Sequence, residues 1–225
     1  RVLVYFTRTP SNVIYATDFI TFKRNSTSDV ELTRTSDTIT YDPNDWKGVR
    51  IAVENLRKDF KAVTGSTNAP IIVGTVGKSK FAKKYKQLSK ELSGKWEQYL
   101  IFTDKGKLVI LGSDKRGTIY GIYELSEQIG VSPWYDWADV PVAVRKDLTI
   151  ARGAYTAGEP AVRYRGIFLN DEAPCLTGWV KHTYGTDYGD HRFYERVFEL
   201  LLRLRANFIW PAMWSWAFYE DDPLN

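Results

Sequence analysis

Several features that would place a chain in a special class are absent from this sequence. Its 225 residues include one cysteine, Cys175, which excludes an internal disulfide. No run approaches the roughly 20 apolar residues of a membrane-spanning helix. The two histidines, His182 and His191, do not share helical metal spacing with carboxylates, and no Cys–His cluster suggests zinc. We therefore expect no membrane partner, no metal and no cofactor.

The positive charge is modest and largely local. The formal net charge is +4, and seven lysines fall between residues 78 and 95. Their spacing favours the solvated face of a helix. Nucleic-acid binding would need aromatic residues interleaved with the basic ones, or a known module, and neither is present. We expect no nucleic-acid partner.

Residues 1–155 predict a small α/β domain because strand-like and helix-like patterns alternate along them. Asp104 to Lys107 has the Lys-Gly centre of a hairpin turn. Gly65 and Gly130 follow helical stripes and are typical of helix ends. The expected strands cover residues 2–6, 39–41, 70–74, 99–103 and 108–111, and the expected helices run from about 45 to 65, 81 to 92 and 114 to 130.

Residues 156–225 predict the first β-α-β unit of a (β/α)₈ barrel. The apolar run 167–169 is typical of a buried strand, and residues 207–214 form a second strand with an aromatic tip. Asp190 is suited to cap the helix at 193–205, whose apolar positions are nearly continuous. Because the sequence stops at Asn225, we expect a truncated barrel.

The strand at 167–169 ends abruptly in Asn170, Asp171 and Glu172. Burying polar groups at the end of a strand costs free energy unless they form hydrogen bonds or ion pairs or have a function. In (β/α)₈ barrels the catalytic residues lie at the C-terminal ends of the strands. On extended backbone Asn170 and Glu172 would share one face, with Asp171 opposed. Two carboxyl groups suit glycoside hydrolysis. The alternative is that Asp171 caps the next turn and pairs with Arg163 or Arg165.

A second polar motif, Gly112 to Gly117, lies at a predicted strand-to-helix turn. With Lys115 and Arg116 at a helix start it could hold a phosphate or a carboxylate, although it matches neither the Walker pattern nor the dinucleotide fingerprint. The alternative is a tight turn in which glycine permits close packing. The tryptophans, Trp214 among them, suit stacking on sugar rings or ordinary packing equally well.

Three segments carry a family resemblance. They read GSDKRGTIYGIYELSEQIGVSPW at 112–134, YRGIFLNDEAP at 164–174 and FELLLRLRANFIWPAMW at 198–214, followed by DDPLN at 221–225. These segments resemble glycoside hydrolase family 115, the xylan α-1,2-glucuronidases, and the resemblance covers about residues 40–225. It implies a domain like the second domain of β-hexosaminidases followed by a (β/α)₈ barrel.

The resemblance also implies a function. The parent enzyme would remove (4-O-methyl)glucuronic acid from glucuronoxylan with inversion, without a cofactor, using carboxyl groups roughly 6.5–9.5 Å apart. It implies Asp171 and Glu172 as catalytic residues and Asn170 and Trp214 as substrate contacts. Lys115 and Arg116 would meet the uronate carboxylate. Further catalytic carboxylates are expected on later strands, and secretion is expected, with Asn25 in a glycosylation sequon.

The sequence departs from the family pattern in two loops. Residues 183–189 read TYGTDYG where a short Gly-rich turn with Asn is usual, and Ser215-Trp216 stands where Gly-Asn is common. Cys175 replaces a small residue. Two rival interpretations remain, a β-hexosaminidase-like enzyme and a non-catalytic carbohydrate-binding or interaction fragment. The sequence predicts no oligomeric state.

Overall fold

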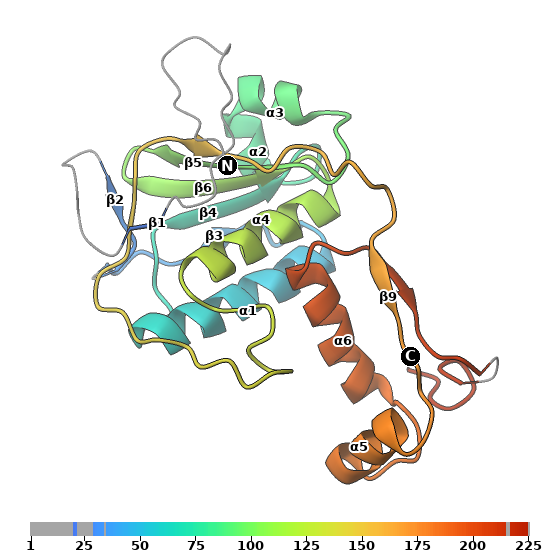
Figure 1. Cartoon of the computed structure of the whole chain (residues 1–225). Coiled ribbons are helices and arrows are strands. Elements are labelled where there is room, and N and C mark those ends of the chain that lie inside the picture. The colour runs from blue at the N-terminus through green and yellow to red at the C-terminus, as the bar shows by residue number, and fades with distance from the viewer. Residues whose placement is uncertain (1–19, 22–28, 34, 215–216, 225) are drawn as a thin grey trace. The chain divides into compact units, whose positions relative to one another are not determined.

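The computed structural model describes residues 20–21, 29–33, 35–214 and 217–224. The predicted strand at 2–6 and the sequon at Asn25 lie outside this part of the chain. The chain divides into two compact units, Arg1–Ala161 and Val162–Asn225 (Figure 1). The predicted domain boundary, between residues 155 and 156, falls six residues earlier.

A five-stranded mixed sheet forms the centre of the first unit. Its order is β3-β4-β6-β5-β8, in which β3, β4 and β6 are parallel while β5 is antiparallel to both β6 and β8. The continuous apolar runs of β4 and β6 suit strands covered on both faces. The strands are β3 Thr40–Tyr41, β4 Ile71–Thr75, β5 Tyr99–Asp104, β6 Lys107–Gly112 and β8 Ala154–Tyr155.

The predicted hairpin connects β5 and β6. Its central residues, Lys105 and Gly106, both have positive φ, at 47° and 74°. Two positive φ angles in succession give the turn type that matches the twist of paired strands, which explains why a Lys-Gly pair predicts this hairpin.

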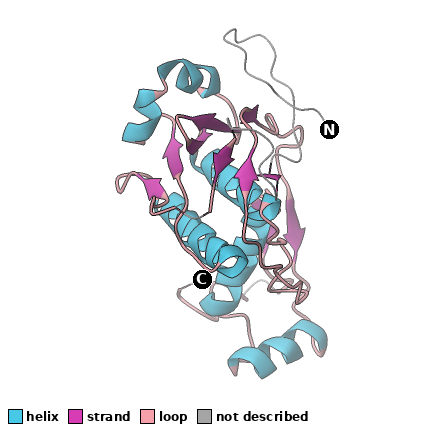
Figure 2. Cartoon of the chain, turned by 90° about the vertical axis from the view of Figure 1, so that its left-hand side faces the viewer, coloured by secondary structure: helices cyan, strands magenta, loops and turns pink. Residues whose placement is uncertain are grey.

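Helices cover both faces of the sheet (Figures 1 and 2). On one face α1, Lys47–Thr64, packs beside α4, Lys115–Gln128. On the other face α2, Lys80–Lys84, and α3, Lys86–Leu92, cover Leu100, Phe102, Val109 and Leu111. Helix α1 ends at Gly65 with φ 80°, as its sequence predicts.

The single helix predicted at 81–92 is wrong, because Tyr85 interrupts it with φ −106° and ψ 55°. The Ser89 hydroxyl donates to the carbonyl of Ala82 at 2.7 Å, so a side-chain hydrogen bond forms at the break in the helix. The Tyr85 ring packs edge-on against Phe102, and its hydroxyl donates to Asp104 at 3.0 Å. The helical spacing of apolar residues continues through Tyr85, so the sequence pattern gives no sign of the break.

A small antiparallel sheet completes the first unit. Its order is β1-β7-β2, with β7 Thr149–Ile150 paired to β1 Ile20–Thr21 and to β2 Val30–Glu31. Among the described residues no helix has the length and apolar character needed to cross a membrane.

The second unit contains two parallel strands joined through two helices. Strand β9, Gly166–Phe168, pairs in parallel with β10, Phe208–Trp210, and the connection holds α5, Cys175–Tyr184, and α6, His191–Arg203. Asp190 caps α6 as predicted, whereas α5 is an additional helix that the predicted β-α-β unit did not include. Residues Gly166 and Phe168 are exposed, so the prediction of a buried strand is wrong here, and the described residues contain no barrel.

Candidate functional site

The polar tip after β9 is a turn and not extended strand. The last ladder contact is the Leu169 amide donating to the carbonyl of Trp210 at 2.9 Å. Three residues later the Glu172 amide donates to Asn170 Oδ1 at 3.2 Å. Because the extended backbone has ended, the alternation expected for extended backbone does not apply, and Asp171 and Glu172 line the same pocket. Asn170 shapes the turn and is not among the lining residues.

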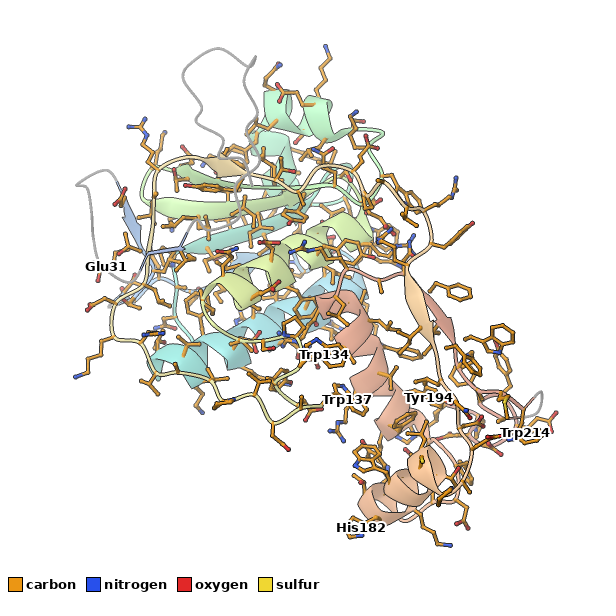
Figure 3. All side chains as sticks on the ribbon, in the orientation of Figure 1. Glu31, Trp134, Trp137, His182, Tyr194 and Trp214 are labelled. Atoms are coloured by element: carbon orange, nitrogen blue, oxygen red, sulfur yellow. The ribbon has the colours of Figure 1, made fainter. Side chains whose placement is uncertain are left out.

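This pocket of ≈ 620 Å³ is built from the tip of β9, both helices and the segment after β10. Figure 3 marks two of its aromatic residues, Tyr194 on α6 and Trp214 beyond β10. Trp214 is 47% exposed, so part of its indole is open to a ligand. The lining contains the carboxylates Asp171, Glu172, Asp187 and Asp221 and the aromatic residues Tyr188, Phe193, Tyr194 and Trp214.

Asp171 is held by the segment that follows β10. Its Oδ1 accepts a hydrogen bond from the Met213 amide at 2.8 Å, and its carbonyl accepts from the Thr177 hydroxyl at 2.5 Å. The alternative pairing with Arg165 does not form, since the Arg165 guanidinium donates to the carbonyls of Arg205 and Val162. Within the described residues, Oδ2 of Asp171 makes no hydrogen bond. One carboxylate oxygen is therefore fixed and the other is available.

Tyr194 forms an inner wall of the pocket. Its ring is buried, and its hydroxyl donates to the carbonyl of Pro211 at 2.8 Å. Burial raises the pKa of the Tyr194 phenol well above its usual value, and the negative charges of Asp171 and Asp221 raise it further. The phenol therefore stays protonated and acts as a hydrogen-bond donor that anchors the chain after β10.

The loop between the helices supplies residues that the sequence did not single out for the site. Asp187, Tyr188 and Gly189 line the pocket, and Asp187 Oδ1 lies 2.6 Å from the Lys181 ammonium. The only sequence signal for this loop is its departure from the family pattern at residues 183–189. Asp221 and Tyr194 were also not predicted as site residues.

Asp222 ties the chain after β10 to the start of α6. It accepts hydrogen bonds from the His191 amide at 2.9 Å, from His191 Nδ1 at 2.8 Å and from the Leu224 amide at 2.9 Å. The His191 amide is the largest cause that lowers the pKa of Asp222 to about 2, and the Leu224 amide and the His191 side chain add to it. This carboxylate fixes the segment that carries its neighbour Asp221.

Lys115 and Arg116 lie in the first unit, at the start of α4. Arg116 is engaged, because its Nε pairs with the buried Glu97 and its guanidinium lies 5.2 Å from the Trp96 ring centroid. Lys115 is exposed, and its Nζ lies 5.9 Å from the centroid of Trp46. Their predicted contact with a uronate stays a prediction.

The Gly112–Gly117 turn is a close-packed turn. Asp114 occupies the helix start by accepting from the Gly117 amide at 2.7 Å. A Cβ on Gly112 would lie 2.1 Å from the Thr118 amide nitrogen. The anion-cradle interpretation is not favoured, because a carboxylate of the chain itself fills the position. Over the described ranges no three His, Cys, Asp or Glu side chains gather as a metal site.

Comparison with known proteins places this site in a family. Residues 157–225 match Glycosyl hydrolase family 115. A solved family GH115 4-O-methyl-α-glucuronidase, with specificity for decorated arabinogalactans, is 36% identical over 87% of this chain, with a TM-score of 0.73. The chain belongs to glycosyl hydrolase family 115. It spans 26% of that solved enzyme.

The chain has two further likenesses. Residues 47–125 match the Glycosyl hydrolase family 67 N-terminus. A mutant Streptomyces plicatus β-hexosaminidase in complex with its product GlcNAc covers 80% of this family 115 chain at 16% identity, with a TM-score of 0.50, and the match spans 30% of that enzyme. This second likeness concerns the fold alone, and it agrees with the predicted mixed α/β class. No curated protein matches the chain.

Proposed function

We propose that this chain forms part of the catalytic pocket of an inverting α-glucuronidase that removes (4-O-methyl)glucuronic acid side groups from xylan. The observation that carries the proposal is the lining of one pocket by Asp171, Glu172 and Trp214. Parallel strands joined through helices, with carboxylates just past a strand end, also suit the first two strands of a (β/α)₈ barrel. On this proposal β9 and β10 begin that barrel.

The chemistry needs one carboxyl group to protonate the leaving xylosyl oxygen and another to deprotonate the attacking water. Asp171 suits proton transfer because Met213 fixes one of its oxygens while the other remains available. Glu172 follows it on the same turn and lines the same space. Trp214 offers a flat apolar face for the sugar ring, and Asn170 stabilises the turn by accepting from the Glu172 amide.

The charge of the pocket limits how a uronate binds. Its ionisable lining consists of four acidic residues plus Tyr188 and Tyr194, and only Asp187 has a lysine partner within the described residues. Carboxylates of like charge repel, so the uronate carboxylate would avoid this wall. We infer that the wall holds the hydroxyl side of the sugar and carries out proton transfer, and that cations elsewhere meet the carboxylate.

Mutation of the two carboxylates tests the catalytic roles. In a longer protein that contains this chain, Asp171→Asn and Glu172→Gln are each expected to lower kcat for uronic acid release from glucuronoxylan by about 10²–10⁴-fold, the range typical of general acid–base groups. Glu195→Gln is the matched control, because Glu195 is exposed on α6 and outside the pocket lining. Unchanged kcat in both pocket variants would contradict the proposal.

The polysaccharide backbone is the finer part of the proposal. Asp187 and Tyr188 bring the loop that departs from the family pattern into the pocket lining, so this loop suits a role in substrate preference. The solved relative has specificity for decorated arabinogalactans. Offering glucuronoxylan and a decorated arabinogalactan to the same preparation decides between the polymers, and faster release from xylan is the expected result.

A non-catalytic carbohydrate-binding role is the alternative, and the half-exposed Trp210 and Trp214 favour it. Titration of xylo-oligosaccharides with and without the glucuronyl branch separates the two functions. Binding that requires the branch supports the glucuronidase, whereas equal binding of both ligands supports the module. Secretion remains part of the proposal, because a polysaccharide substrate is met outside the cell.

A further inference from the structure

Three side chains gather at one edge of the central sheet in the first unit. Trp46 follows β3, Lys78 follows β4 and Lys115 follows β6. These are the three parallel strands, so their C-terminal ends meet at the same edge, which is where open α/β sheets bind ligands. The Lys78 ammonium lies 4.8 Å and the Lys115 ammonium 5.9 Å from the Trp46 ring centroid.

Among the described residues neither Lys78 nor Lys115 makes an ion pair, whereas Lys84 and Lys95 each lie within 3.3 Å of a carboxylate oxygen. The carboxylate of Asp45, the residue before Trp46, is hydrogen-bonded to main-chain donors. It accepts from the amides of Trp46 at 2.8 Å and Thr75 at 3.0 Å. Two exposed lysines therefore place their ammonium groups over one ring.

A second acidic group at this edge is similarly engaged. Asp42 accepts from the Lys80 amide at 2.6 Å and from the Asn44 amide at 3.0 Å. These amides, and the charges of Lys80 and Lys83, lower the pKa of the Asp42 carboxyl group. Among the described residues Lys78 and Lys115 are the two ammonium groups that lie over the Trp46 ring.

Part of the Trp46 side chain is exposed to solvent. It stands at the start of α1, is 45% exposed and makes no side-chain capping hydrogen bond. An indole face packs against the C–H face of a pyranose ring, and ammonium groups pair with a carboxylate. One flat apolar face beside two unpaired cations thus matches a sugar that carries an acid group.

We propose that Trp46, Lys78 and Lys115 of the first unit form a binding surface for a hexuronate. The choice of a hexuronate among anionic ring compounds rests on the proposed function, whereas the match to an anionic ring does not. Single-stranded nucleic acid is a poorer match, because its binding uses successive aromatic residues along a basic groove. The surface gives Lys115 a role that Arg116, paired with Glu97, does not share.

The test is a titration of the full chain labelled with ¹⁵N, followed by NMR at the indole signals. D-glucuronate is the probe and D-glucose its neutral match, and Trp46→Phe assigns the Trp46 signal by removing it. We expect a saturable shift of that signal with glucuronate and none with glucose at equal concentration. Equal shifts with both sugars, or none with either, would overturn the proposal.

Lysine variants test the ionic part. Lys78→Gln and Lys115→Gln are each expected to weaken glucuronate binding about two- to fivefold, as for exposed ion pairs. Lys90→Gln, an exposed lysine on α3, is the control and leaves the affinity unchanged. Unaltered affinity in both edge variants would refute the role of the cations. Tighter binding of a short oligonucleotide than of glucuronate would refute the ligand class.

A further variant separates this proposal from the proposed function. Asp171→Asn alters the pocket of the second unit, and the Trp46 shift is expected to persist in it. If the shift persists while the longer protein releases no uronic acid, the proposed function fails and the surface stands. If uronic acid is released while the Trp46 signal never moves, the surface alone is refuted.

Discussion

The acidic residues of the second unit differ in how many donors hold them. Asp171 receives one amide hydrogen bond on its carboxylate, whereas Asp222 receives three hydrogen bonds. Burial of Asp190 opposes its ionisation, yet the Arg192 guanidinium and the Phe193 amide still lower the pKa of its carboxyl group. The carboxylates of Asp222 and Asp190, which have several donors, stabilise the fold. Asp171, whose carboxylate has one donor, can interact with a ligand.

Replacing Asp222 with Asn is expected to destabilise the second unit in a pH-dependent way. The pKa of about 2 lies below the ordinary aspartate value, so ionised Asp222 stabilises the fold near neutral pH. That contribution is lost as the pH falls from about 4 to about 2, where the folded state also becomes protonated. The variant should therefore have a lower Tm than the parent near neutral pH, and the gap should close in acid.

Thermal unfolding of both proteins over this pH range measures the effect. Glu195→Gln serves as the control, because Glu195 is exposed and is expected to show no gap at any pH. A Tm difference for the Asp222 variant that stays constant into acid would show that lost charge is not the cause.

At the scale of elements, the β6–α4 connection is a turn in which two glycines have no room for a Cβ atom. A Cβ on Gly117 would lie 2.3 Å from the carbonyl oxygen of Gln98, and one on Gly112 would overlap the Thr118 backbone. The Thr118 hydroxyl in turn lies 2.8 Å from the Thr75 hydroxyl of β4. These glycines are needed because helix α4 begins directly against the sheet.

Gly112→Ala is expected to lower the free energy of unfolding by about 1–3 kcal/mol, because the added methyl forces the turn away from Thr118. Gly48→Ala is the matched control, since its methyl meets only the terminal Cδ1 atom of the Ile119 side chain, at 3.2 Å. Urea unfolding followed by circular dichroism measures both variants. A Gly112 variant as stable as the Gly48 variant would show that this close approach is not essential.

At the scale of the whole molecule, the elements predicted correctly were those whose ends are marked by a residue typical of a helix end, a helix start or a turn. Helix α1 ends at Gly65, α6 begins at Asp190, and the β5–β6 hairpin turns at Lys105 and Gly106. The break at Tyr85 and the helix α5 were missed. The break depends on contacts with residues distant in sequence, such as Phe102, and Pro174 before α5 makes no side-chain capping hydrogen bond.

The residues indicated in advance for the candidate pocket either follow a strand directly or, like Trp214, were implied by the family resemblance. Asp171 and Glu172 follow a strand directly, and that position marks them as unusual. Tyr188, Tyr194 and Asp221 come from three other segments and enter the lining only when the second unit folds. No local pattern distinguishes such residues from ordinary loop and helix positions.

The architecture of the second unit leads to a final prediction about activity. The two strands leave Phe168 48% and Phe208 50% exposed, and the pocket walls come from one β-α-β unit. Hydrolysis requires an acid and a base on opposite sides of the scissile bond, held in fixed positions. We expect the 225-residue chain by itself to release no uronic acid from glucuronoxylan above a protein-free blank.

The assay compares the chain with a longer protein that contains it, at equal molar concentration. Release by the longer protein and none by the chain would mean that further strands supply the opposing carboxylate and cover the exposed aromatic residues. Release by the chain that rises with its concentration and disappears in Asp171→Asn would contradict this prediction. It would show that Asp171, Glu172 and Asp221 already suffice for both proton transfers, and the search for a partner carboxylate would then move to Asp221.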